Sequence, residues 1–254
     1  MVDTTNFPAL TAVTPDTKVS AKYSFISTAT VIEVFKSMGW YPTRVSQTKV
    51  KIPGRAPYAK HMVEFQNVNF PATPALGDSV PRILLTNSHD GSSSFVIRMG
   101  LIRLVCSNGL VVGTNLVAPI RIRHVGYTPG LVYSAVNQIE GAFNAVSASL
   151  QRMLTRDLTP ERQLVFANAA LKLRYPEGAP INPSQLLSVH RPADVGNTVW
   201  QVFNRIQENL IRGGARYQGV AANGRVTNRT MRGIRSIDAN TLLNTQLWAL
   251  AEAA

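Results

Sequence analysis

The chain is poor in cysteine and in long apolar runs, and each shortage excludes a class of protein. The single cysteine, Cys106, excludes an internal disulfide and is typical of a protein from a reducing compartment. The longest apolar runs span only a few residues, so no segment is predicted to cross a bilayer. The N-terminus has no basic region followed by an apolar stretch, and we therefore expect no secretory signal. Together these absences predict a cytoplasmic protein.

Signatures of catalysis are also scarce. The 14 Asp and Glu residues do not cluster as a two-metal nuclease requires, and no glycine-rich phosphate-binding loop is present. Cys106 has no neighbour in the sequence that would lower its thiol pKa, which favours a structural role over nucleophilic catalysis. The best metal candidates are His89 and Asp90 with His124 or His61, but their spacing matches no metal-site signature. Catalysis is therefore disfavoured, and no cofactor is predicted.

Positive charge is what the sequence has in excess. The 26 Lys and Arg residues outweigh the acids to give a formal net charge of +12, and 19 of the 26 are arginine. Arginine binds phosphate with two parallel hydrogen bonds and stacks on bases, so this excess predicts nucleic acid as the partner. The apolar content of 45% is that of an ordinary globular protein, which excludes global disorder.

The first half of the chain predicts one helix followed by an antiparallel sheet. Residues 1–22 lack periodicity and predict an extended arm, and a helix with apolar positions from Val31 to Met38 follows it. An Asn108-Gly109 step between apolar runs is a strong hairpin signal, because a type I′ turn needs positive φ at both central residues. The expected strands are Thr43–Ile52 paired with Lys60–Val68, Val80–Asn87 with Ser94–Met99, Leu101–Ser107 with Leu110–Val112, and Ala118–Val125.

The second half predicts helices. One helix over 128–155 carries a seven-residue apolar repeat, which indicates packing across the sheet and, as an alternative, packing on a neighbouring subunit as well. Further helices are expected over 160–172, 198–212 and 239–252, and residues 212–235 predict a mobile arginine-rich loop. The fold class is therefore α+β: an antiparallel sheet, a long helix across it and a helical C-terminal region. The expected regions are 1–22, 23–157 and 158–254.

Three stretches without acids concentrate the positive charge. They lie between Glu33 and Glu64, between Asp90 and Glu140, and over residues 212–235. Aromatic residues are interleaved with the first two, as in proteins that bind single-stranded nucleic acid, although a solvated basic surface that confers solubility remains the alternative. The candidate nucleic-acid-binding residues are Arg44, Lys49, Lys51, Arg55, Lys60, Arg98, Arg103, Arg121, Arg123, Arg225, Arg229 and Arg232.

Several segments together resemble a known domain family. The segments are Asn87-Ser88-His89-Asp90-Gly91-Ser92, Arg103-Leu104-Val105-Cys106-Ser107-Asn108-Gly109-Leu110, Ile122-Arg123-His124, Thr198-Val199-Trp200-Gln201-Val202-Phe203-Asn204, Gln207-Glu208-Asn209-Leu210 and Leu243-Asn244-Thr245-Gln246-Leu247-Trp248. They resemble a phage- and plasmid-borne domain family of unknown function, number 932, from about residue 24 to the C-terminus. The resemblance implies a mobile-element protein in a host bacterium and implies no established activity.

The order of elements and the charge are also similar to the phage annealing recombinases of the Red-beta, RecT and Erf group, which is a fold-level analogy. The leading hypothesis is a cytoplasmic single-stranded DNA-binding protein that anneals strands without nucleotide hydrolysis and self-assembles into a ring or filament through the helix over 128–155 and the final helix. The alternatives are an interaction protein that inhibits host defence through a basic surface, and a metal-dependent hydrolase using His89, Asp90 and His124.

Overall fold

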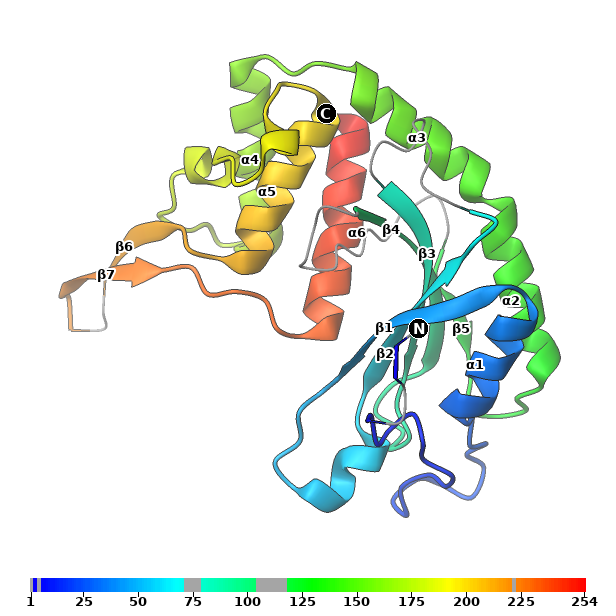
Figure 1. The fold of residues 1–254 in the computed structure, drawn as a ribbon. Helices are drawn as coiled ribbons and strands as arrows, with labels where there is room; N and C mark the ends of the chain where they lie inside the picture. The colour runs from blue at the N-terminus through cyan, green and yellow to red at the C-terminus, as the bar shows by residue number, and fades with distance from the viewer. Residues whose placement is uncertain (1, 4–5, 71–78, 104–117, 221–222) are drawn as a thin grey trace. The chain divides into compact units, whose positions relative to one another are not determined.

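The computed structural model describes residues 2–3, 6–70, 79–103, 118–220 and 223–254 (Figure 1). Cys106 and the Asn108-Gly109 turn lie outside the described residues. The chain divides into two compact units: the described residues up to 103, with 118–145, belong to unit 1, and the described residues from 146 onward belong to unit 2. The structure groups residues 146–157 with the helical C-terminal region.

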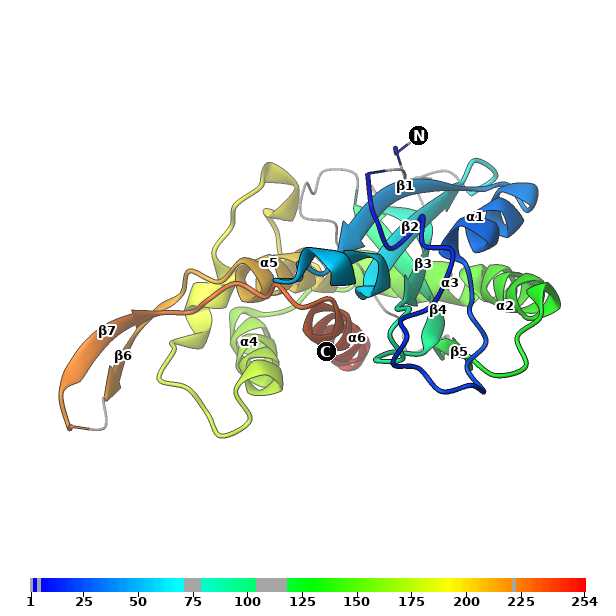
Figure 2. The same cartoon turned by 90° about the horizontal axis from the view of Figure 1, so that it is seen from below.

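Unit 1 is built on a five-stranded antiparallel sheet, with helices α1 and α2 on one of its faces (Figures 1 and 2). The strands follow each other in chain order: β1 (Trp40–Gln47), β2 (His61–Asn67), β3 (Ser79–Asn87), β4 (Phe95–Arg103) and β5 (Ile120–Ile122). The pairing of the first two predicted strand pairs is confirmed, although β1 ends at Gln47 and not at Ile52. Leu101 extends β4 instead of starting a strand of its own, and the strand expected over 118–125 is only three residues long.

The helical face of the sheet is apolar. Helix α1 (Thr28–Ser37) begins after Ser27, whose hydroxyl accepts a hydrogen bond from the Thr30 amide. Its buried Phe35 ring stacks on Phe65 of β2, with 4.2 Å between ring centroids. A buried phenylalanine of this kind contributes about 2 kcal/mol by removing apolar surface from water. This layer fixes which side of the sheet remains for charged side chains.

The helix predicted over 128–155 is two consecutive helices, α2 (Pro129–Gly141) and α3 (Phe143–Thr155). The Ala142 amide bonds to the Ile139 carbonyl three residues back, which is a tighter turn than an α-helix has, and Gly141 is a weak helix former at this point. The apolar repeat is buried within the chain itself, at Val132, Val136, Ile139, Phe143, Val146, Leu150 and Met153. The seam is therefore used in packing within the chain.

The segment that was predicted as an arm packs on unit 1. It contains no helix or strand among its described residues, yet Ala9 and Leu10 are almost fully buried. The His89 ring, through Nε2, donates to the Ala9 carbonyl at 2.9 Å, and the Asp16 amide donates to the His89 carbonyl at 2.8 Å. The N-terminal segment is therefore held by a histidine of the core.

Unit 2 consists of helices and one hairpin. Its main helices are α4 (Pro160–Arg174), α5 (Val199–Arg212) and α6 (Ile237–Ala253), and short 3₁₀ helices η3 (Pro183–Leu187) and η4 (Pro192–Asp194) lie between α4 and α5. Thr198 and Gln201 form a reciprocal capping box at the start of α5. Trp200, Phe203 and Trp248 pack together where α5 meets α6. The apolar face of the final helix is thus used inside unit 2.

The segment over 212–235, predicted as a mobile loop, contains an antiparallel hairpin instead. Strand β6 (Arg216–Val220) pairs residue for residue with β7 (Val226–Thr230). The β-branched residues Val220, Val226 and Thr227 favour strand geometry, and this outweighs the low apolar content that suggested a loop. The hairpin extends away from α4 and α5 (Figures 1 and 2).

Candidate nucleic-acid interface

The hairpin and its two flanks present a dense set of exposed cations. All six arginines over 212–235 are exposed: Arg212, Arg216, Arg225, Arg229, Arg232 and Arg235. The sequence contains no acid between Glu208 and Asp238. Of the six, Arg212 bonds to the Glu208 carboxylate at 2.6 Å. A projecting segment with this excess of exposed cations attracts polyanions.

The two faces of the hairpin differ in composition. Cross-strand pairing places Tyr217 opposite Arg229, and Gly219 opposite Thr227, on one face. The Arg229 side chain crosses the strand over Gly219: a Cβ added to that glycine would meet Arg229 Nε at 2.6 Å. The opposite face carries Arg216 and the exposed Val220–Val226 pair. One face therefore combines an aromatic ring with a guanidinium.

The base of the hairpin is anchored on unit 2. The Gln185 side-chain amide bonds to both backbone groups of Arg216, donating to its carbonyl and accepting from its amide, at 2.8 Å each. Arg174 of α4 donates to the Leu210 and Arg232 carbonyls. Gly213 has a φ of 79°, and a Cβ there would meet the Met231 carbonyl oxygen at 2.3 Å. These contacts anchor the base of the hairpin. Sequence reasoning missed Gln185 and Tyr217.

The sheet of unit 1 carries a second group of charges on the face opposite α1 and α2. Strand register places Arg44, Glu64, Arg82, Arg98 and Arg121 on this charged face. The register confirms that the basic residues of several strands share one face of the sheet. Sequence reasoning missed the acid among them, because Glu64 ends a stretch without acids in the sequence but lies opposite Arg44 in the sheet.

The charges on this face compensate one another. Glu64 Oε1 lies 3.7 Å from the Arg44 guanidinium, and both Glu64 and Arg82 are buried. Burial raises the pKa of Glu64, which the positive charges of Arg44 and Arg82 oppose. Arg98 donates to the Thr86 hydroxyl at 3.3 Å. The middle of the charged face is therefore less available to a ligand than its exposed ends, Arg44 and Arg121.

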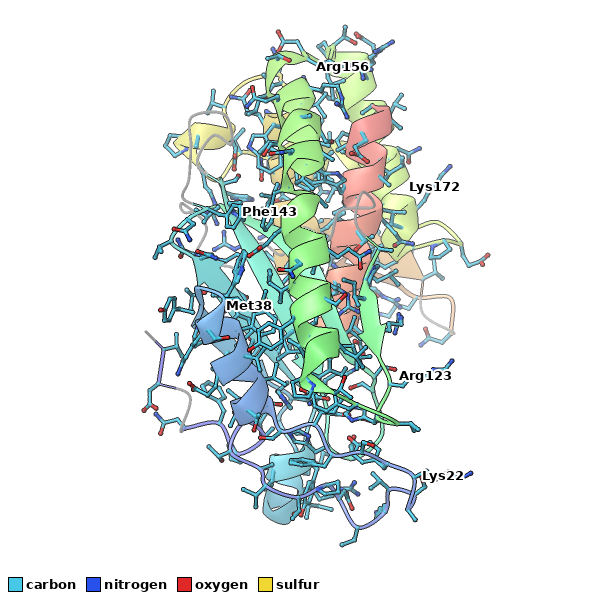
Figure 3. All side chains as sticks on the ribbon, turned by 90° about the vertical axis from the view of Figure 1, so that its right-hand side faces the viewer. Lys22, Met38, Arg123, Phe143, Arg156 and Lys172 are labelled. Atoms are coloured by element: carbon cyan, nitrogen blue, oxygen red, sulfur yellow. The ribbon has the colours of Figure 1, made fainter. Side chains whose placement is uncertain are left out.

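The remaining candidate nucleic-acid-binding residues of unit 1 differ in burial and in their partners. Arg55 forms a 2.9 Å ion pair with the buried Asp16, which ties the β1–β2 connection to the N-terminal segment. Lys49 and Lys51 are exposed in that connection, and Lys60 is half-buried. Arg123 follows β5 and points away from the chain (Figure 3).

Two further predictions for unit 1 concern Arg103 and the aromatic residues between the cations. Arg103 ends β4, and its side chain lies outside the described part of the chain. Trp40 and Phe65, which were expected to interleave with the cations, are fully buried on the helical face. Tyr41 is the exposed aromatic at this end of β1. Of the six aromatics interleaved with the cations, two are therefore core residues, and Tyr58, Phe70 and Tyr127 are half-buried.

The histidines considered for metal binding have structural partners instead. His89 binds the Ala9 carbonyl, and the His124 ring stacks on Tyr23 with centroids 4.5 Å apart. Burial lowers the pKa of His89 and of His124, and it lowers the pKa of His61 to about 4. The Asp90 carboxylate accepts a hydrogen bond from the Ser92 amide at 2.9 Å, as expected of a turn residue. Within the described residues, no three His, Cys, Asp or Glu side chains could hold a metal ion.

The polar residues of α5 form a buried network in unit 2. Glu208 accepts two hydrogen bonds from Arg191, at 2.9 and 3.1 Å, in addition to the one from Arg212. The Asn209 amide donates to the Leu186 and Ser188 carbonyls and so ties η3 to α5. The Gln207-Glu208-Asn209-Leu210 segment, which contributed to the family resemblance, therefore connects the elements of unit 2 from which the hairpin projects.

Comparisons with known proteins agree with the sequence motifs. None of the described helices is long and apolar enough to cross a membrane. The chain is 37% identical over 235 residues to the UPF0380 protein YafZ of Escherichia coli strain K12, covering 92% of this chain and 83% of that protein. It is 36% identical over 234 residues to the UPF0380 protein YfjQ of the same strain, with 92% and 82% covered. No solved structure matches the chain. A family model for a domain of unknown function, DUF932, matches residues 17–248, and the chain therefore belongs to the DUF932 family.

Proposed function

We propose that the protein binds single-stranded DNA and promotes strand annealing without nucleotide hydrolysis. One observation carries the proposal: the β6–β7 hairpin projects from unit 2 with exposed arginines on a stretch that contains no acid. Arginines held on an exposed strand pair can reach successive phosphates of an extended polyanion. An acid-free basic stretch of this length exceeds what solubility alone needs.

Cations of unit 1 support the same function. Lys49, Lys51, Arg121 and Arg123 are exposed there and add to the positive field around the chain. Annealing requires two phosphate backbones to approach each other, and exposed arginines and lysines lower the repulsion between them. The order of helix, antiparallel sheet and further helices is similar to that of phage annealing recombinases, and this analogy is what favours annealing over binding alone.

The binding step is tested by fluorescence anisotropy with a labelled oligonucleotide across a salt series. We expect the logarithm of affinity to fall linearly with the logarithm of salt concentration. The variant Arg216→Gln, Arg225→Gln, Arg229→Gln should lose on the order of 100-fold in affinity and about 2 units of salt slope, because three phosphate contacts disappear. Failure of the wild-type protein to bind at low salt would overturn the proposal.

A charge-matched control separates the hairpin from net charge. The variant Lys22→Gln, Arg162→Gln, Lys172→Gln removes the same charge at exposed positions outside residues 212–235. The side chains of Lys22 and Lys172 point into solvent (Figure 3). Its affinity should stay close to that of the wild type. Equal losses in the two variants would mean that net charge, and not the hairpin, drives binding.

The annealing step is tested separately with two complementary oligonucleotides that carry a fluorescence donor and acceptor. We expect energy transfer to develop faster with the protein than without it, in buffer free of nucleotide triphosphate. Binding without acceleration would retain the DNA-binding function and discard annealing. Purification of one host protein in a fixed ratio, with no nucleic acid, would instead favour the inhibitor of host defence.

A further inference from the structure

The geometry points to a base-stacking platform on one face of the hairpin, made by Tyr217 and Arg229, that gives the protein its preference for single strands. This inference rests on the proposed DNA-binding function and assigns strand recognition to two named side chains. The two lie opposite each other across the strand pair, and neither residue is buried. We define this pair, with Gly219 beside it, as the platform.

Arg229 is held in place before any ligand binds. Its Nε donates to the Thr227 hydroxyl at 3.3 Å, and its Nη2 donates to the Val220 carbonyl at 3.4 Å. Gly219 leaves room for this arrangement, since a Cβ there would meet Nε, Cδ and Cζ of Arg229 at 2.6 to 2.9 Å. An exposed arginine usually loses rotamer freedom on binding, and a side chain already laid across the strand loses less.

Tyr217 supplies the second planar group. It belongs to β6, on the same face as Gly219 and directly opposite Arg229. A phenol ring and a guanidinium are both planar groups on which nucleobases stack, and such stacking tolerates any base because every base has a π-face. The sequence places no carboxylate between Glu208 and Asp238 to repel a nearby phosphate.

The platform distinguishes single strands from duplexes for a steric reason. Bases in a duplex are stacked on one another, so their faces are closed to a protein side chain, whereas unpaired bases can be splayed out. Arg216 and Arg225 are exposed on the hairpin outside the platform, and phosphate contacts of this type act on both forms of DNA. Removing the platform should therefore change strand preference, while removing the other arginines should weaken both kinds of binding.

The test compares Tyr217→Ala and Tyr217→Phe on single-stranded, double-stranded and abasic single-stranded oligonucleotides. Tyr217→Ala should weaken binding to the single strand about tenfold, and Tyr217→Phe should retain it because the ring remains. Duplex binding should change by less than about twofold. On the abasic strand, which has phosphates but no bases, the wild type and Tyr217→Ala should bind equally.

Two further variants test Arg229 and its support. Arg229→Lys keeps the charge but loses the plane, so it should keep the salt slope and lose part of the single-strand preference. Gly219→Ala should have the same effect, because its methyl group displaces the Arg229 side chain. Circular dichroism and the melting temperature verify that each variant is folded.

The outcomes separate the two proposals. A wild-type protein that binds no nucleic acid overturns the proposed function. A wild-type protein that binds single-stranded DNA, with Tyr217→Ala and Arg229→Lys behaving like the wild type, leaves that function standing and overturns the platform. Loss of abasic-strand binding in Tyr217→Ala also contradicts stacking, because the tyrosine would then act without bases.

Discussion

The hairpin of unit 2 and the sheet of unit 1 both carry arginines, but the arginines have different neighbours. On the sheet, Glu64 lies between Arg44 and Arg82, and Arg55 of the following connection is paired with Asp16. On the hairpin, no acid occurs along the sequence, and the strand pair stands away from the helices of its unit. Positive charge that is paired with an acid or buried is less available to a ligand than exposed charge on a stretch without acids.

The comparison predicts that lowering the pH destabilises the sheet of unit 1 more than the rest of the chain. The pKa of His61 is about 4 in the fold, below its ordinary 6.5, because burial disfavours the charged ring. The unfolded chain therefore binds a proton that the folded chain does not between pH 6.5 and 4. The unfolding free energy of unit 1 should fall by about 3 kcal/mol as the pH drops through that window.

Hydrogen exchange with mass spectrometry measures this effect for each region of the chain. Peptides from β2 and β3 should lose protection as the pH falls from 7 to 4, after correction for the intrinsic exchange rate. The variant His61→Gln should lose part of this pH dependence. Unchanged protection of β2 at pH 4 would contradict the buried, neutral histidine.

A change at the base of the hairpin should have the next largest effect. Gly213→Ala forces an unfavourable positive φ and drives a methyl group into the Met231 carbonyl, so it should destabilise unit 2 by about 2 kcal/mol. DNA affinity should fall with it, because the hairpin loses its fixed position. Gly214→Ala is the matched control: it also has positive φ, but a Cβ there meets nothing within 4 Å. Equal thermal melts for the two variants would discard the close contact as the cause.

Cations of the sheet region should contribute less to DNA binding than those of the hairpin. The triple variant Lys49→Gln, Lys51→Gln, Arg121→Gln removes as much charge as the hairpin triple, from exposed positions of unit 1. We expect a loss of about fivefold, from a weaker long-range field and few direct contacts. The anisotropy assay measures both triples side by side, and a larger loss in the unit 1 variant would reverse the comparison.

The smallest effect is expected at the acid of the charged face. Glu64→Gln makes the sheet resemble the hairpin in lacking an acid, but the site is buried, so DNA affinity should change by less than about twofold. Burial already disfavours the Glu64 carboxylate, so stability at neutral pH should not fall by more than about 1 kcal/mol. A large gain in DNA affinity would show that the charged face takes part in binding.

Much of the fold follows from local patterns that the sequence displays. Strand pairs β1–β2 and β3–β4 and the helices begun by Thr128-Pro129, Thr159-Pro160 and Thr198 lie where periodicity and capping residues predict them. The break at Ala142 and the pairing of β6 with β7 were missed. In both cases the deciding interaction is a hydrogen bond to a specific partner, and apolar periodicity carries no signal for it.

The candidate site was predictable in composition but not in geometry. Counting acids along the chain identifies residues 212–235 as basic, and alternating residues identify Arg121 and Arg123 as exposed. It does not identify the pairing of Arg55 with Asp16, which are 39 positions apart. Nor does the count identify the hydrogen bonds between the Gln185 side-chain amide and the backbone of Arg216. These contacts and the Arg55–Asp16 pair join segments that only the folded chain brings together.

By itself, the sequence determined the α+β class, the large positive charge and the absence of acids around the hairpin, because each is a property of composition or of local periodicity. The tertiary structure alone decided which arginines are exposed and which are paired. It also decided that Tyr217 lies opposite Arg229, with Gly219 leaving room for the guanidinium. Strand register and burial depend on contacts between distant residues, and a count along the chain contains no information about them.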